Sequence, residues 1–131
     1  MTEQQTITEF ITARLDEDHY RAYQAQGLLG IPTPWWTWRH LRNRFGTSIT
    51  RADALHIERH SPARVLCEVT AKSALLSIHH ARDSWGHCMG CGTDSDGSLF
   101  MAIDDCPVLR HLAAVHSDHP DYNPAWAVDT T

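Results

Sequence analysis

The chain has 131 residues, which is enough for one modest hydrophobic core and too few for two independent ones. Its apolar content of 42% and charged content of 21% are ordinary for a soluble globular protein. No apolar run approaches the roughly 18 residues of a membrane span, and the N-terminus lacks the pattern of a secretory signal. We therefore expect a cytoplasmic protein without membrane contact, whose thiols stay reduced.

The formal net charge of −5 is unevenly distributed along the chain. Residues 35–64 contain six arginines and two acidic residues, whereas residues 94–131 contain seven aspartates and one arginine. Such a division indicates either a basic patch for an anionic partner beside an acidic flank, or two regions that face each other in the fold. Both interpretations stay open at this point.

Residues 1–27 are predicted to contain an N-terminal helix, because apolar side chains recur along one face at helical spacing. These side chains are Ile7, Phe10, Ile11, Leu15 and Ala22. Acidic residues occupy the opposite face, as expected for a helix that packs one side against a core. Thr6 or Thr8 could cap the start of the helix, and Gly27 suits its end.

Residues 28–49 form a segment rich in tryptophan and arginine, for which two structures compete. The two prolines of IPTPWW predict a turn or an extended link. The apolar spacing from Trp38 to Phe45 fits a helix begun by Thr33 and Pro34. The alternation from Trp36 to His40 is typical of a strand instead. We favour the helix.

Residues 50–82 are predicted to form one long kinked helix. Thr50 is a suitable N-cap, with an acidic residue three positions later. Ser61 followed by Pro62 restarts the helix after a break, because proline is favoured at the first helical position. From Pro62 to about Arg82 the apolar residues form a face that is wide enough to be packed on two sides.

Residues 83–106 contain glycine, aspartate and serine without a helical period, which predicts a loop that carries cysteines. A short hairpin at SLFMAI is an option within it. The Asp-Cys-Pro sequence at 105–107 is typical of a helix start, so residues 107–131 should hold a C-terminal helix and a tail. The tail is expected to be extended, with Tyr122 and Trp126 packed against the body of the domain.

Cys88 and Cys91 form a Cys-x-x-Cys pair that could be a disulfide, a redox pair or part of a metal site. A redox pair of the thioredoxin type follows a strand and opens a helix. Here the pair follows a long predicted helix and precedes a glycine-containing loop. Two thiolates on such a turn can wrap one ion, and Cys106 adds a third at a helix N-terminus, where the helix dipole stabilises a thiolate. We therefore favour a metal site.

A closed tetrahedral site needs a fourth ligand, for which three histidines are candidates. His79 or His80 would lie in the last turn of the long helix and reach the loop, whereas His87 is adjacent to Cys88 and awkward as a co-ligand. The predicted zinc ligands are His79, Cys88, Cys91 and Cys106, with His80 as the second choice for the histidine. Zinc is expected because thiolates with one imidazole favour it. Cys67 lies on an apolar stripe and is expected to be a buried free thiol.

Together these patterns predict a mainly α fold for residues 1–131: one small helical domain stapled by a single structural zinc site. Two stretches of the chain also resemble a known family. HIERHSPARVL at 56–66 and SDHPDYNPAW at 117–126 are similar to motifs of small uncharacterised proteins from actinobacteria and their phages. The resemblance implies a long helix, a cysteine-bearing loop and a tail that ends in tryptophan. It implies no activity.

Three classes of function compete. We favour a non-enzymatic, zinc-stabilised binding module. Such a module would be an accessory or regulatory protein of an actinobacterium or its phage that acts through protein–protein contacts. A homodimer is also compatible with this function. Tryptophan and arginine dominate such interfaces, and the candidate contacts are Trp35, Trp36, Trp38, Arg39, Arg42 and Arg44. The alternative is nucleic-acid binding through residues 35–64, which the net acidity opposes. A metalloenzyme is not expected, because the chain has neither a His-Glu-x-x-His motif nor a deaminase motif.

Overall fold

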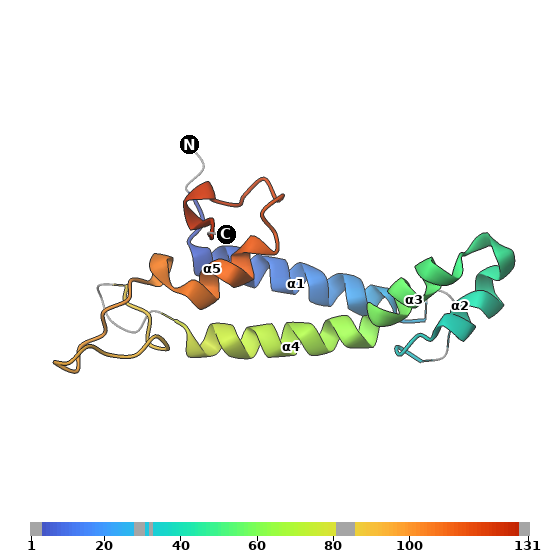
Figure 1. The fold of residues 1–131 in the computed structure, drawn as a ribbon, viewed down its shortest axis with the longest axis horizontal. Coiled ribbons are helices and arrows are strands. Elements are labelled where there is room, and N and C mark those ends of the chain that lie inside the picture. The colour runs from blue at the N-terminus through green and yellow to red at the C-terminus, as the bar shows by residue number, and fades with distance from the viewer. Residues whose placement is uncertain (1–3, 28–30, 32, 81–85, 129–131) are drawn as a thin grey trace. The chain divides into compact units, whose positions relative to one another are not determined.

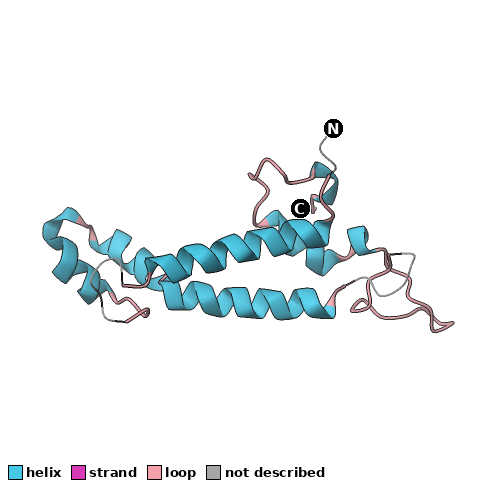
Figure 2. Cartoon of the chain, turned by 180° about the vertical axis from the view of Figure 1, so that it is seen from behind, coloured by secondary structure: helices cyan, strands magenta, loops and turns pink. Residues whose placement is uncertain are grey.

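The computed structural model of the protein describes residues 4–27, 31, 33–80 and 86–128. Within these ranges the chain is mainly helical and forms no extended strand, which confirms the predicted fold class (Figures 1 and 2). No described helix is both long enough and apolar enough to cross a membrane. Contacts divide the chain into two compact units, one from residues 1–15 and 72–131 and the other from residues 16–71.

Five α-helices and three short 3-10 helices make up the described chain. The α-helices are α1 (Ile7–Ala25), α2 (Trp38–Phe45), α3 (Arg51–Arg59), α4 (Pro62–Ile78) and α5 (Pro107–Ala114). The 3-10 helices are η1 (Gly46–Ser48), η2 (Ile103–Asp105) and η3 (Pro124–Trp126).

Helix α1 is capped by Thr6, the first of the two predicted threonines. The Thr6 hydroxyl accepts a hydrogen bond from the Glu9 amide at 3.1 Å, and the Glu9 carboxylate accepts one from the Thr6 amide at 3.3 Å. This reciprocal pair satisfies two backbone donors that the first turn would otherwise leave open. The predicted apolar face is confirmed, since all five of its side chains are buried.

In the first unit, aromatic side chains of the C-terminal tail pack against the ring of Phe10. The Phe10 ring centroid lies 5.3 Å from that of Trp126 and 5.9 Å from that of Tyr122. Trp126 is only 3% exposed, so the prediction that the tail packs against the body is confirmed. The tail is not extended, however. It consists of turns and of η3, which Asn123 caps through its side-chain oxygen.

The start of α2 corrects the position expected from the sequence. The helix reading is confirmed, but the helix begins at Trp38 and not at Thr33 and Pro34. Thr37 is the N-cap, and it exchanges hydrogen bonds with the backbone and side chain of His40. The Thr33 hydroxyl instead accepts from the Trp35 amide and forms a local turn, so it is not available to cap a helix.

The core of the second unit joins α2 to α3. Its buried members are Ile31, Leu41 and Ala54, and four partly buried side chains pack against them: Trp36, Trp38, Ile49 and Ile57. Helix α3 begins as predicted, because the Thr50 hydroxyl accepts from the Asp53 amide at 3.1 Å. The α2–α3 segment is therefore a small helical pair with its own apolar centre.

The expected long helix is two helices, α3 and α4, separated by His60 and Ser61. Pro62 opens α4 as predicted, and the helix ends at Ile78; the end expected at Arg82 lies outside the described residues. Two expectations for α4 are wrong. Cys67 is exposed rather than buried, and packing on two sides does not extend to the C-terminal half of the helix, where Ile78 is 55% exposed.

Candidate metal centre

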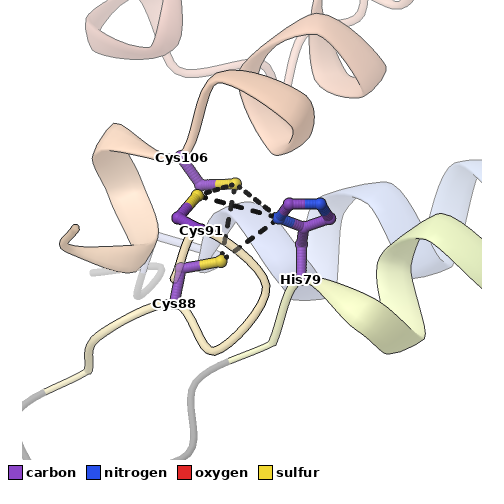
Figure 3. A group of neighbouring side chains, drawn as sticks. All are labelled: His79, Cys88, Cys91 and Cys106. Carbon is purple, nitrogen blue, oxygen red and sulfur yellow. Dashed lines mark hydrogen bonds between the residues drawn. The ribbon is translucent and has the colours of Figure 1, made fainter. Parts of the chain in front are cut away.

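Four side chains from three separate segments meet in the first unit. They are His79, Cys88, Cys91 and Cys106, and their candidate ligand atoms all lie within 4.8 Å of one another. The Nδ1 atom of His79 lies 3.4 Å from the sulfurs of Cys88 and Cys106 and 3.7 Å from that of Cys91. The Cys106 sulfur lies 3.6 Å from that of Cys88 and 3.5 Å from that of Cys91. Figure 3 shows the imidazole directed at the three sulfurs.

These separations fit a tetrahedral ion. Bonds of about 2.3 Å to sulfur and about 2.0–2.1 Å to nitrogen place two sulfurs about 3.8 Å apart, and a sulfur and a nitrogen about 3.6 Å apart, around one centre. Every measured separation is within about 0.3 Å of these values. The five separations given above are therefore compatible with one metal ion bound by all four side chains.

The ends of two helices supply two of the four side chains. His79 directly follows α4, and Cys106 is the N-cap residue of α5. The loop between these helices supplies Cys88 and Cys91 (Figure 3). One ion at this position would therefore connect α4, the loop and α5.

The other two histidine candidates do not join the cluster. The Nδ1 atom of His80 lies 2.6 Å from the Ser77 carbonyl oxygen, so its ring turns back onto the end of α4. His87 forms an antiparallel bridge with Ala102 and is not part of the group of four. Among the three histidines considered from the sequence, the structure thus brings only His79 to the sulfurs.

Short backbone pairings position the loop cysteines. The Cys88 amide donates to the Met101 carbonyl at 2.7 Å, and the Ile103 amide donates to the Gly86 carbonyl at 2.7 Å. These bonds fix the strand-like stretch before Cys88 against the residues that lead into η2. Because η2 ends beside Cys106, this backbone pairing brings the Cys106 sulfur close to the Cys88 sulfur.

The tip of the loop is closed by Asp94 and not by a regular hairpin. The carboxylate of Asp94 accepts from the Asp96 amide at 2.9 Å and from the Ser98 amide at 3.1 Å. A single antiparallel bridge pairs Thr93 with Leu99 next to this turn. The optional hairpin at SLFMAI is therefore replaced by two isolated bridges, since the chain between them forms turns.

Gly90 lies against the imidazole of His79. A Cβ atom placed on Gly90 would be 2.8 Å from Nδ1 of His79 and 2.7 Å from the Ile78 carbonyl oxygen. Both distances are shorter than side chains tolerate, so only glycine lets the turn between Cys88 and Cys91 approach the ring this closely. The sequence indicated glycine for the turn itself, and only the structure reveals this contact.

The surroundings of Cys91 oppose the loss of its thiol proton when no metal is bound. Desolvation by burial, together with hydrogen bonds to the sulfurs of Cys106 and Cys88, raises the pKa of the Cys91 thiol from 9.0 to about 12. Cys88 and Cys106 are fully buried. Three thiolates this close together would repel one another, so a bound cation would be needed to stabilise them.

The tryptophans proposed as partner contacts have different surroundings in the second unit. Trp35 is 55% exposed, whereas Trp36 and Trp38 pack against the α2–α3 core. The guanidinium carbons of Arg39 and Arg51 lie 5.7 Å and 5.5 Å from the Trp38 ring centroid. Arg39, Arg42 and Arg44 are exposed. The structure thus leaves Trp35 and the arginines at the surface and makes the other two tryptophans largely structural.

Comparison with known proteins identifies a family but no activity. No curated protein and no solved structure shows significant similarity to the chain. One family model matches residues 4–128, which is nearly the whole sequence, including all four residues of the cluster. The chain belongs to this family, a family of unknown function (DUF6221).

Proposed function

We propose that the cluster of His79, Cys88, Cys91 and Cys106 holds one structural Zn²⁺. Three thiolates and one imidazole form a donor set that favours zinc, and the spacing of the sulfurs matches a tetrahedral shell. The observation that carries the proposal is that four side chains able to bind one ion lie within 4.8 Å of one another. A complete shell leaves no coordination position for water or substrate, which is the arrangement of structural rather than catalytic zinc sites.

We infer from the same shell that the protein acts as a binding module and not as an enzyme. A catalytic zinc would need an open position and a nearby base. Asp105, the acidic side chain next to Cys106 in the sequence, is engaged in an ion pair with Arg110 at 3.0 Å. The ion would serve the fold by joining the two ends of the cysteine loop to α4 and α5.

The partner is proposed to be a protein that contacts the α2–α3 segment and Trp35. Exposed tryptophan and arginine are the residue types that contribute most at protein interfaces. Here Trp35 is exposed, and arginine–aromatic pairs occur at Trp38 and at Phe45, where the Arg44 guanidinium lies 5.5 Å from the ring. The resemblance to proteins of actinobacteria and their phages favours an accessory or regulatory role in the cytoplasm of such a cell.

Nucleic acid remains the second candidate partner, because arginines placed over aromatic rings also suit phosphate contacts and base stacking. The overall charge of −5 opposes it. If Arg39, Arg42 and Arg44 contacted phosphates, affinity would fall by about 0.9 log units per contact for each tenfold rise in salt. We expect no measurable binding to duplex or single-stranded oligonucleotides at physiological salt.

Affinity capture from a lysate of the source organism tests the proposed function. The bait is the zinc-loaded full chain, and the captured fraction is treated with nuclease before analysis. The expected result is one nuclease-resistant protein that is lost with Trp35→Ala and with the Arg39→Ala, Arg42→Ala, Arg44→Ala triple variant. Retention of this protein by both variants would contradict the proposed surface. Capture that disappears with nuclease would favour the nucleic-acid candidate.

A further inference from the structure

The second unit contains a pocket of about 280 Å³ that the proposed zinc site does not use. Its apolar walls are Ala22 and Ala25 of α1 together with Pro62 and Val65 of α4. Ala22 and Pro62 are buried. The small alanine side chains leave room between the two helices here, which larger residues at these positions would fill.

One wall of the pocket is Trp36, and its indole nitrogen lacks a partner. The Nε1 atom is buried and makes no hydrogen bond with any described residue. A buried donor without an acceptor is less stable than one that is paired. An acceptor on a molecule bound in the pocket would remove this cost, so the orphaned donor favours an occupant that carries a carbonyl or carboxylate oxygen.

The rim of the pocket carries one arginine and one aspartate, with a histidine beside them. Arg21 and His60 both line it and are exposed, and Arg21 makes no ion pair within the described residues. Asp18 also lines the pocket but is already engaged in an interaction of its own. The Arg21 guanidinium is therefore available to pair with a carboxylate of an occupant.

The size of the pocket suits one side chain of a partner protein. Sites for drug-sized ligands and cofactors enclose about 300–1,000 Å³ and bury most of the ligand. A space of about 280 Å³ lies at the lower end of this range. It is large enough for a single apolar anchor residue, the kind of contact that contributes a large share of binding energy at interfaces, and this occupant agrees with the protein-binding function proposed above.

We propose that this pocket binds an apolar anchor side chain carried on an acidic segment of the partner protein. The anchor lies against Ala22, Ala25 and Val65, an oxygen of the same segment accepts from Trp36 Nε1, and its carboxylates face Arg21 and His60. The proposal rests on the protein-binding function proposed above and specifies the chemistry that the partner must present.

Titration of the zinc-loaded full chain with a capped Glu-Leu-Glu tripeptide tests the pocket directly. The readout is the NMR signal of the Trp36 indole N–H, which the Trp36→Phe variant identifies by its disappearance. We expect a saturable shift of this signal at millimolar peptide. Capped Glu-Ala-Glu and Lys-Leu-Lys peptides should bind at least about tenfold more weakly, because one lacks the anchor and the other reverses the charge.

Two variants separate the pocket from general charge attraction. Ala25→Leu fills the space and should abolish the shift, and Arg21→Gln should weaken binding several-fold without filling the pocket. Arg110→Gln removes the same charge from the first unit, outside both the pocket and the proposed partner surface, and should leave the affinity within about twofold. If Ala25→Leu does not fold, the contrast between Arg21→Gln and Arg110→Gln still tests the proposal.

The proposal is overturned if no peptide shifts the Trp36 signal, if all three peptides shift it equally, or if the shift persists in Ala25→Leu. A shift produced by a generic oligonucleotide but not by Glu-Leu-Glu would also overturn it and would favour nucleic acid. If the pocket proposal fails, the proposed function can still be judged separately. Capture of a partner from the lysate depends on Trp35 and the three arginines, and a failed peptide titration would leave that result unchanged.

Discussion

The cysteine loop (residues 86–106) and the α2–α3 segment (residues 37–59) differ in what their buried side chains are. Between residues 86 and 106 the buried side chains are those of Cys88 and Cys106, both members of the cluster that could hold a metal ion. The α2–α3 segment contains none of the four cluster residues and instead packs Leu41 and Ala54 into an apolar core. If the proposed ion is bound, coordination would stabilise one part of the chain and burial the other, and each part should respond to its own perturbation.

Loss of a metal ligand should have the largest effect, and the effect should be confined to the first unit. Cys106→Ser removes a buried side chain that we propose as a ligand, and structural zinc in small domains contributes roughly 10 kcal/mol or more of apparent binding energy. We expect loss of the metal after gel filtration, measured by elemental analysis, and a markedly lower melting temperature. The matched control is Cys67→Ser, since Cys67 is exposed and outside the cluster. Retention of one metal ion per chain by Cys106→Ser would refute this prediction.

Truncation of the aromatic centre tests the part of the first unit that is held by burial. Phe10→Ala removes a fully buried ring that contacts Tyr122 and Trp126, and such changes cost about 3–5 kcal/mol. Denaturant unfolding should show this loss while the isolated variant still binds one metal ion. Tyr23→Ala is the control, because that ring is 66% exposed and its removal should change stability by about 0.5 kcal/mol or less. Equal effects of the two variants would argue against the packing described.

The complementary test perturbs α2–α3 and leaves the cluster intact. Leu41→Ala should cost about 2–5 kcal/mol, because Leu41 is completely buried in the core of the second unit. Metal content should remain unchanged. Leu55→Ala provides the same chemical change at a position that is 40% exposed, and its effect should be smaller. Loss of metal from Leu41→Ala would show that the two parts are not held independently.

The smallest expected effect is that of a change at Gly90, which lies against His79 and is not itself a proposed ligand. Gly90→Ala places a methyl group against His79 and the end of α4, so the imidazole must move away from the sulfurs. By analogy with other groups that orient a ligand, metal affinity should fall by about 10–100-fold. A competition titration with a chromophoric chelator measures this change. Met89→Ala in the same turn should bind the metal as tightly as the unaltered protein.

The cluster could be predicted from the sequence because its cysteines are recognised by short spacings along the chain. Cys88 and Cys91 are separated by the spacing that one ion requires, and Cys106 precedes a proline that marks a helix start. The end of the predicted helix suited both His79 and His80, and the structure distinguishes them because His79 reaches the sulfurs, whereas His80 turns back onto Ser77. The closeness of Gly90 to His79 could not be predicted, because it depends on how two segments approach each other in space.

The α2–α3 segment was harder to predict, because its sequence satisfies more than one pattern. Threonine and proline occur twice before Trp38, and only the hydrogen bonds of Thr33 and Thr37 show which threonine caps the helix. The tryptophans carried a further ambiguity. Their side chains suit an interface and a core equally well, so their individual burial became apparent only from the packing around Leu41.

X-ray absorption spectroscopy of the purified protein tests the central claim most directly. It identifies the bound element and resolves the ligands around it in one measurement. We predict zinc with three sulfur ligands at about 2.3 Å and one nitrogen ligand at about 2.0–2.1 Å. A protein that carries no transition metal, or an ion with fewer than three sulfurs and an oxygen ligand from water, would contradict the account of a closed structural site.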